Sequence, residues 1–381
     1  MLNDGFFESL SDWMDLTDPR VDRGKNHCLK EMVILAICGT ICGANTWADI
    51  ERFCCTHLAW FEKYLELPHG VPSHDTFGRV FRRLDTAEFY ECVIRWIQEI
   101  DFVLKDKVVS IDGKTLRGSH DRANGQAPLH VVNAWASELK VCLGQVSVDS
   151  KSNEIPAVQE LLGLLQLEGA VVTMDAMHCQ KKTAQKIQDA GADYVLPVKG
   201  NQEKLHNRLR QETDKWVDQD FDVRGLRQHS QTEKSRDRVE TRTCVVKAAP
   251  ADLKKQWPGL KTIGMIVRTR ELRDGAESSE TTVFISSRTP KVREHVNFLR
   301  QHWCVENELH YTLDVTFAED ASRIRRENGA AVTSGFRRVA LSILKMDTTV
   351  KDNIHGKRMR AGWDTRNLES ILQCFQQRIA A

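Results

Sequence analysis

Two aspartates stand directly after short hydrophobic segments. Asp112 follows residues 108–111, and Asp175 follows residues 171–174. In α/β sheets, ligand and metal sites are built at the carboxyl ends of strands. Two neighbouring carboxylates there are costly unless a cation neutralises both, and Mg2+ prefers oxygen ligands. Either aspartate alone is more often a helix N-cap or turn residue, but the pair favours a divalent metal site.

A second cluster of acidic and basic side chains lies in segment 302–310. At helical spacing, His302, Glu306 and His310 are four residues apart and share one face. An acidic residue between two histidines suits a metal or phosphate site. The alternative is a row of polar side chains that faces solvent and binds nothing. Glu308 is a rival third carboxylate. Its offset of two residues points it away from Glu306, so only one of the two can face the aspartates.

The elements that must position these side chains change in type along the chain. Residues 1–105 show almost entirely helical patterns and predict an all-helical N-terminal domain. Residues 106–200 and 288–345 combine short apolar strands with helices, which predicts a mixed α/β domain with covered faces. Residues 201–287 alternate polar and apolar side chains, as an antiparallel sheet with one wet face does. Residues 346–381 are expected to form a basic C-terminal tail region.

Arginines form two further patterns. In the helix predicted after Pro72, Arg79 and Arg82 lie away from the apolar face, as phosphate ligands do on a DNA-reading helix. A solvated basic face is the alternative. Between residues 321 and 360, ten Lys and Arg residues stand against three Asp and Glu residues. This local excess suits DNA contact, and it includes Arg323, Arg325 and Arg326.

Composition excludes several classes of protein. The 381 residues include 54 Lys and Arg against 53 Asp and Glu, a net charge of +1, which excludes a uniformly basic DNA-coating protein. With 41% hydrophobic and 28% charged residues, neither a disordered nor a membrane protein is expected. The acidic start is unlike a signal peptide, and the scattered cysteines lack zinc-site spacing. A cytoplasmic protein with reduced thiols is therefore expected.

The motifs around these residues resemble those of insertion-sequence DDE transposases, most closely the H-repeat-associated (ISAs-type) family. In the catalytic part they are Ile111-Asp112-Gly113-Lys114, Met174-Asp175-Ala176, Val198-Lys199-Gly200-Asn201-Gln202 and segment 302–310. The amino-terminal stretch is similar as well, at Asp18-Pro19-Arg20, at Gly43-Ala44 with Trp47 to Ile50, and at Pro72 to Phe77. The resemblance extends from about residue 10 to about residue 375.

The resemblance implies a ribonuclease-H-like catalytic domain at residues 106–200 and 288–345. A β-rich insertion at 201–287 interrupts it, and a helical, DNA-binding domain at 1–105 precedes it. The catalytic and metal-binding residues implied are Asp112, Asp175 and Glu306, holding Mg2+ or Mn2+. DNA phosphates are expected at Lys114, Lys199, His302, Arg79, Arg82, Arg323, Arg325 and Arg326.

The implied activity is that of a DNA transposase. Such a protein binds the ends of its insertion sequence, cleaves phosphodiester bonds and transfers strands into target DNA. Its partner would be double-stranded DNA, bound as a homodimer, in the cytoplasm and on the nucleoid, with no membrane partner. Two alternatives remain open. One is a metal-dependent nuclease of the same fold that does not join DNA, and the other is a catalytically decayed relic that still binds DNA.

One departure from broader relatives limits what carries over. Those relatives have a tyrosine, an arginine and a lysine where this chain has Leu299, His302 and Leu313. Hairpin chemistry that rests on those side chains is therefore not expected here. As a hypothesis, His302 takes the place of the arginine.

Overall fold

The computed structural model describes residues 7, 15–100, 103–121, 125–149, 153–234, 238–273 and 275–379. The chain forms two compact units. Unit 1 comprises Met1–Val103, Gly113–Ala157 and Glu306–Ala381, and unit 2 comprises Leu104–Asp112 and Val158–Val305. The chain therefore passes between the units at positions far apart in the sequence.

Unit 2 is built around a mixed β-sheet. Its strands follow the order β1 (Val108–Thr115, of which Val108 to Asp112 belong to this unit), β4 (Val171–Met174), β5 (Asp193–Val198), β9 (Glu277–Ser286), β8 (Thr262–Leu272), β7 (Arg238–Ala248) and β6 (Arg227–Lys234). β1, β4 and β5 are parallel, and every later pairing is antiparallel. The predicted mixed α/β class is therefore confirmed.

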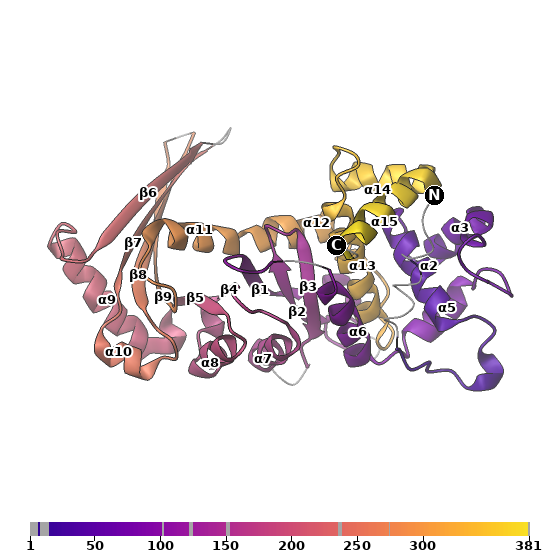
Figure 1. Cartoon of the computed structure of the whole chain (residues 1–381), viewed down its shortest axis with the longest axis horizontal. Helices are drawn as coiled ribbons and strands as arrows, with labels where there is room; N and C mark the ends of the chain where they lie inside the picture. The colour runs from indigo at the N-terminus through magenta and orange to yellow at the C-terminus, as the bar shows by residue number, and fades with distance from the viewer. Residues whose placement is uncertain are drawn as a thin grey trace. The chain divides into compact units, whose positions relative to one another are not determined.

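The central strands are hydrophobic because both of their faces are covered. All four residues of β4 are buried. Parallel strands with two covered faces are typically runs of valine and isoleucine. Helix α11 (Val292–His302) lies on one side of these strands and α8 (Lys181–Asp189) on the other (Figure 1). The core between the sheet and α11 comprises Val108, Val171, Val195, Cys244, Val246, Phe284, Val296, Phe298 and Leu299.

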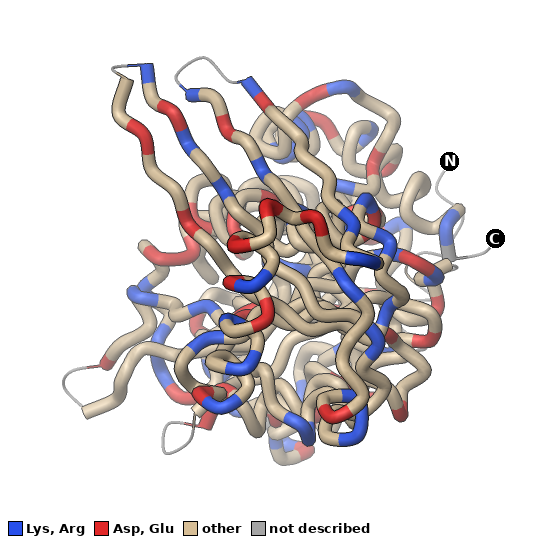
Figure 2. Tube along the Cα trace, turned by 90° about the vertical axis from the view of Figure 1, so that its left-hand side faces the viewer, with Lys and Arg blue, Asp and Glu red and all other residues tan. Residues whose placement is uncertain are grey.

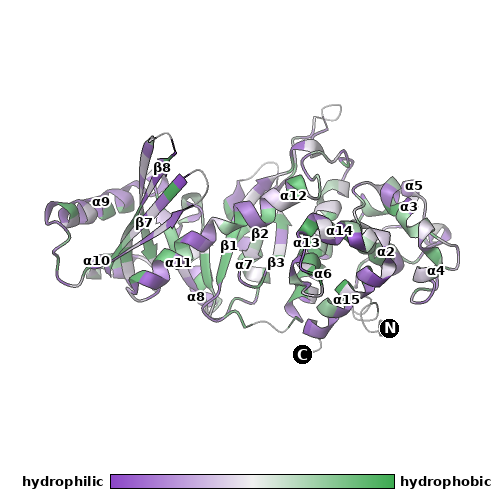
Figure 3. Cartoon of the chain, turned by 90° about the horizontal axis from the view of Figure 1, so that it is seen from above, coloured by the Kyte–Doolittle hydropathy of each residue, from purple (hydrophilic) through white to green (hydrophobic). Residues whose placement is uncertain are grey.

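The segment predicted as a β-rich insertion adds its strands to this same sheet. The register from Val195↔Ser286 to Val198↔Val283 joins β9 to β5. Along the outer parts of these strands, positively and negatively charged residues alternate (Figure 2). The segment also contains α9 (Glu203–Asp218), which is mostly hydrophilic (Figure 3), and α10 (Ala251–Gln256). β6 is the last strand in the order, and all its residues are polar.

Unit 1 is mainly helical. Its first helices are α2 (Leu29–Ile41), α3 (Trp47–Thr56), α4 (Leu58–Phe61), α5 (His74–Phe81) and α6 (Thr86–Gln98). Side chains at their starts fix several boundaries. Thr46 and Asp49 form a capping box on α3, Ser73 caps α5, and Asp85 caps α6. These caps satisfy backbone N–H groups that the helices themselves leave without partners.

The remaining elements of unit 1 surround one buried helix. The strands β2 (His130–Ala136) and β3 (Val141–Ser147) form an antiparallel pair. Almost every residue of α13 (Gly329–Met346) is buried. The other helices are α12 (Tyr311–Val315), α14 (Ile354–Trp363) and α15 (Thr365–Ile379), and α7 (Glu154–Leu164) spans the division between the units.

The C-terminal region corrects one expectation. Residues 346–381 were expected to be a basic tail, but α14 and α15 pack into unit 1, with Leu372 and Phe375 fully buried. Two of the cations are buried as well. Lys357 Nζ lies 2.9 Å from Asp347 Oδ2, and Arg358 donates to the carbonyl oxygens of Thr316 and Thr40. Much of the local positive charge is therefore inside the protein. The other predicted domain limits stay a prediction.

A buried ionic cluster anchors α13. Glu319 accepts hydrogen bonds from Arg338 Nη1 at 2.6 Å and Nη2 at 3.3 Å, and Arg337 Nη1 lies 3.8 Å away. Arg338 Nε also donates to Asn133 Oδ1 on β2 at 2.6 Å. Burial opposes ionisation of Glu319, but the charges of Arg338 and Arg337 outweigh it and lower the pKa of this carboxyl. The cluster therefore joins α13, β2 and the segment before α13.

Replacing this buried anion is expected to be costly. Glu319→Gln leaves the two arginines buried without a countercharge, so the free energy of unfolding should fall by about 3–5 kcal/mol. Chemical denaturation monitored by circular dichroism measures the change, with Glu327→Gln at an exposed position as the control. A loss below about 1 kcal/mol would contradict the anchoring role.

Candidate active site

The pairing of β1 and β4 brings the two predicted aspartates to the same edge of the sheet. The parallel register runs from Val108↔Val171 to Ile111↔Met174. Asp112 and Asp175 are the next residues on each side of this last pair. Asp112 and Asp175 are therefore level with each other at the carboxyl end of β4, while β1 continues past Asp112 to Thr115.

Asp175 does not cap a helix with its side chain. It occupies the N-cap position of the short 3-10 helix η4 (Ala176–His178), but its carboxylate makes no capping hydrogen bond. The side chain is exposed, and its Oδ1 lies 3.6 Å from Nε2 of His302. This contact with His302 is the main influence that lowers the pKa of Asp175, and the charge of Lys199 acts in the same direction against the effect of burial. Asp175 is therefore an anion at neutral pH.

A chain of polar contacts holds His302 in this position. The imidazole is buried at the end of α11, and its Nδ1 lies 3.3 Å from the hydroxyl of Thr173. Thr173 donates to the hydroxyl of Ser110, and Ser110 donates to the carbonyl of Gln301. The contacts thus join β4, β1 and α11. His302 faces Asp175 rather than solvent.

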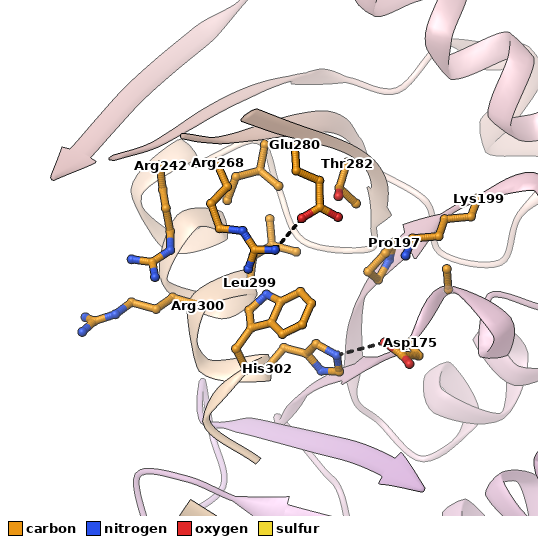
Figure 4. A pocket seen from close by; sticks show the side chains of 13 residues that line it. Asp175, Pro197, Lys199, Arg242, Arg268, Glu280, Thr282, Leu299, Arg300 and His302 are labelled. Carbon is orange, nitrogen blue, oxygen red and sulfur yellow. Dashed lines mark hydrogen bonds and ion pairs between the residues drawn. The ribbon is translucent and has the colours of Figure 1, made fainter. Parts of the chain in front are cut away.

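A small cavity of about 50 Å3 opens beside Asp175. Figure 4 shows Asp175 and His302 facing each other, with Lys199 on the far side of Pro197 and an ion pair between Arg268 and Glu280. Lys199 is exposed and has no ion pair with any residue that the structure describes. The lining is Asp175, Ala176, Pro197, Lys199, Arg242, Ile266, Arg268, Glu280, Thr282, Leu299, Arg300, His302 and Trp303.

The arginines of this cavity were not predicted as site residues, and acids of the same unit already bind them. Arg268 pairs with Glu280 and lies 4.7 Å from the ring centroid of Trp303. Arg242 pairs with Glu240 at 2.8 Å and also contacts Glu233. The alternation of charges around Arg242 is visible in the sequence, but the position of Arg268 follows only from the register of β8.

The third predicted carboxylate lies in an irregular helix. Glu306 is exposed within a π-helix, Val305–His310, and belongs to unit 1. A π-helix is wider than an α-helix, and such segments occur frequently at functional sites. The prediction that His302, Glu306 and His310 share one face assumed a single α-helix, but α11 ends at His302, and Glu306 and His310 lie in the π-helix that follows. His302 and His310 are largely buried, and Glu306 is exposed.

The structure favours Glu306 over its rival. Glu308 is half-buried and accepts a hydrogen bond from Trp135 Nε1 at 3.4 Å. Its carboxylate is therefore engaged inside unit 1, whereas that of Glu306 is open to solvent. No three His, Cys, Asp or Glu side chains of the described residues already lie close enough together to hold a metal ion. Asp112 and Asp175 nevertheless supply hard anionic oxygens, the donors that Mg2+ prefers.

Comparisons with known proteins identify the family. The model described as "Transposase DDE domain" matches residues 104–343, and the one described as "DDE_Tnp_1-associated" matches residues 11–97. The "Putative transposase YncI" of Escherichia coli O157:H7 is 37% identical over 96% of this chain and 94% of its own length. The chain belongs to the DDE transposases. The "H repeat-associated putative transposase YhhI" of Escherichia coli K12 is 37% identical to this transposase over 91% of the chain and 92% of its own length.

The H-repeat-associated resemblance of this DDE transposase is thereby confirmed. A solved piggyBac transposase synaptic complex with hairpin DNA aligns with 99% of the chain and 79% of its own, at 12% identity and a TM-score of 0.40. That similarity is too low to support a conclusion about fold or function. In the described part of the chain, no helix is both long and apolar enough to cross a membrane.

Two groups of basic residues predicted to contact DNA have different environments in this DDE transposase. Lys114 is buried, and its Nζ lies 2.7 Å from both carboxylate oxygens of Asp314 and 4.0 Å from Asp320. The structure therefore argues against the predicted phosphate contact at Lys114, because the ammonium is already neutralised inside unit 1. In contrast, one pocket of unit 1 is lined by Arg79, Arg82, Arg323, Arg325 and Arg326.

Replacing Lys114 and replacing Lys199, the two lysines predicted to bind phosphate, should change the free energy of unfolding by different amounts. Lys114→Met leaves Asp314 without its partner, and burial already raises the pKa of that carboxyl. The free energy of unfolding is expected to fall by about 2–4 kcal/mol. Lys199→Met, at an exposed lysine, should change it by less than about 0.5 kcal/mol. Denaturant titration of both variants measures this, and equal effects would refute a structural role for Lys114.

His310 should make stability depend on pH. Burial above all, with the charges of Lys114 and Arg338, lowers its pKa from 6.5 to about 3. His310 therefore takes up a proton at a higher pH in the unfolded chain than in the folded protein. As a result, the free energy of unfolding has its full value above pH 6.5 and falls as the pH drops from 6.5 towards 3. Between these two pH values, His310 lowers the free energy of unfolding by about 1.4 kcal/mol for each pH unit of acidification. His310→Gln should flatten the curve in this window, while the exposed-site control His355→Gln should not. An unchanged slope in His310→Gln would contradict the assignment.

Proposed function

We propose that this protein is a metal-dependent DNA transposase that binds the ends of its insertion sequence, cleaves them and joins them to target DNA. The observation that carries the proposal is the level placement of Asp112, on β1, and Asp175, directly after β4. The carboxylate of Asp175 is exposed and ionised, and it caps no helix. Membership of the DDE transposase family supports the same chemistry.

The proposed ligands of Mg2+ or Mn2+ are Asp112, Asp175 and Glu306. If these residues hold such ions, the metal would supply Lewis-acid stabilisation of negative charge at the phosphodiester and a water of lowered pKa. His302 orients Asp175 and favours its charged form. Lys199, exposed on the same cavity, is placed to attract a phosphate oxygen of the strand that is cut.

The proposed reaction has two steps. Hydrolysis of one phosphodiester frees a 3′-hydroxyl at the end of the element. That hydroxyl then attacks a phosphodiester of the target, so one phosphodiester replaces another and no nucleotide cofactor is required. The substrate is double-stranded DNA, and bringing two ends together requires at least a homodimer on the DNA. We place this activity in the cytoplasm, on the nucleoid.

The fold assignment belongs to the same proposal. The parallel strands β1, β4 and β5, with helices on both sides, are compatible with a ribonuclease-H-like catalytic domain. The helix and strands between residues 201 and 287 would then be the insertion, and the helices within residues 1–105 the DNA-binding domain. A nuclease without joining activity, and a relic that binds DNA without cutting it, are the alternatives.

Asp175→Ala is expected to abolish both steps. With DNA that carries the gene's own flanks and Mg2+ or Mn2+, strand cleavage and joining should fall by about a hundredfold or more, because a proposed metal ligand is lost. DNA binding should persist. Asp112→Asn should behave alike, while Asp214→Asn, at an exposed site on α9, should resemble the wild type.

The products distinguish the alternatives. Cleavage and joining by the wild type, both lost in Asp175→Ala, would support the transposase. Cleavage without any joined product would favour a nuclease. Binding with neither activity in either metal would favour a relic. Cleavage that survives in both aspartate variants would refute the proposed site.

A further inference from the structure

A second pocket, in unit 1, is lined mainly by arginines. Its volume is about 400 Å3, much larger than that of the cavity beside Asp175, and the two share no residue. One wall comes from α5 and the first residue of α3, and the other comes from the segment that precedes α13. Its lining is Trp47, His74, Asp75, Gly78, Arg79, Arg82, Arg323, Ile324, Arg325, Arg326 and Gly329.

Three of these arginines are exposed and lack a side-chain partner among the residues that the structure describes. Arg323, Arg325 and Arg326 are exposed, and none forms an ion pair or side-chain hydrogen bond with a residue that the structure describes. This differs from the other cations of the basic C-terminal region. Arg338 and Arg358 are buried and bonded inside the protein. Arg323, Arg325 and Arg326 of this region are therefore available to an external anion at the pocket.

Arg79 of α5 and Arg82, the C-cap residue of that helix, are only weakly engaged. Arg79 donates to the carbonyl of Asp75 at 3.4 Å and to the hydroxyl of Thr76 at 3.3 Å, both on its own helix. Arg82 Nε lies 3.7 Å from Glu327 Oε2, too far for a hydrogen bond. That nitrogen is buried and has no hydrogen-bond partner among the described residues. On the α5 side of the pocket too, an arginine nitrogen therefore lacks a hydrogen-bond acceptor among the described residues.

The acids near the pocket do not balance these charges. Asp75 is the single acidic residue of the lining, and its side chain is largely exposed. The other nearby acids, Glu51 and Glu327, lie outside the lining. Glu51 accepts from His74 at 2.6 Å, and Glu327 approaches Arg82. Five guanidinium groups against one lining carboxylate leave a strong positive field in a concave site, which attracts anions.

The arginine segment is also held in place before any ligand arrives. At its start, a side chain at Gly118 would meet the carbonyl oxygens of Asp320 and Ser322 at 2.6 and 2.4 Å, so the two segments are in close contact. At its end, Asn328 donates its backbone N–H to the carbonyl of Arg82 and its side-chain amide to the carbonyl of Leu84. Binding therefore requires little additional ordering of this segment.

We propose that the pocket formed by Arg79, Arg82, Arg323, Arg325 and Arg326 binds consecutive phosphates of a DNA strand. This inference rests on the proposed transposase function and adds a second, composite DNA contact to it. Arginine presents a planar fork of donors that matches a phosphate in a bidentate manner. A pocket that combines five such groups from two segments exceeds the needs of a single phosphate. The strand can come from the end of the element or from the target.

Salt dependence of DNA binding tests the proposal. Neutralising one phosphate-binding arginine should reduce the slope of log K against log salt concentration by about 0.9 and weaken binding about three- to tenfold at low salt. The variants are Arg79→Ala, Arg325→Ala and Arg326→Ala, measured by fluorescence anisotropy on duplexes from the gene's flanks and on unrelated duplexes. Arg360→Ala removes the same charge from an exposed residue of α14 that pairs with Asp352, and should leave the slope unchanged.

Each outcome leads to a decision. A smaller slope in the pocket variants alone, with unchanged thermal unfolding and with the slope restored in Arg325→Lys, supports the pocket. A loss limited to flank DNA assigns it to the element's ends, and an equal loss on unrelated DNA assigns it to general backbone or target contact. Wild-type slopes in every pocket variant overturn the pocket while leaving the transposase proposal intact, provided Asp175→Ala still binds DNA. A wild-type protein that binds no DNA overturns both.

Discussion

Parallel pairing between β1 and β4 determines the arrangement at the carboxylates. The register runs from Val108↔Val171 to Ile111↔Met174, so Asp112 and Asp175 are level with each other where β4 ends, while β1 continues to Thr115. Such a pair is unfavourable unless positive charge compensates it. The polar chain from Ser110 through Thr173 to His302 brings an imidazole to Asp175, and Lys199 adds an ammonium group nearby. Buried β-branched residues hold the strands in this register.

Positive charge serves two physically distinct purposes in this protein. The buried cations Lys114, Arg338 and Lys357 each have an anion within hydrogen-bond distance. These groups join elements distant in sequence. Lys199 and Arg325 are exposed, form no ion pair with a described residue, and each lies at a pocket. A near-neutral total charge thus coexists with strongly positive local surfaces.

The sequence predicted the strands that carry the aspartates because fully buried parallel strands are continuous hydrophobic runs. Helix starts such as that at Ser73 were also predictable, since a cap is a local interaction. The wrong assignments involve tertiary contacts. Counting charges cannot reveal that Arg358 contacts backbone carbonyls far along the chain, or that Lys114 meets Asp314. Likewise, four-residue spacing presumes one continuous helix, whereas α11 ends at His302 and Glu306 lies in a separate π-helix.

The outermost strand, β6, has a consequence of a different kind. A strand at the end of a sheet presents unpaired backbone groups to which a strand of another molecule can add. β6 is entirely polar, and it carries charges at Arg227, Glu233 and Lys234. A second molecule pairing there would gain backbone hydrogen bonds but bury almost no apolar surface. The composition of β6 therefore protects an extended sheet against edge-to-edge aggregation.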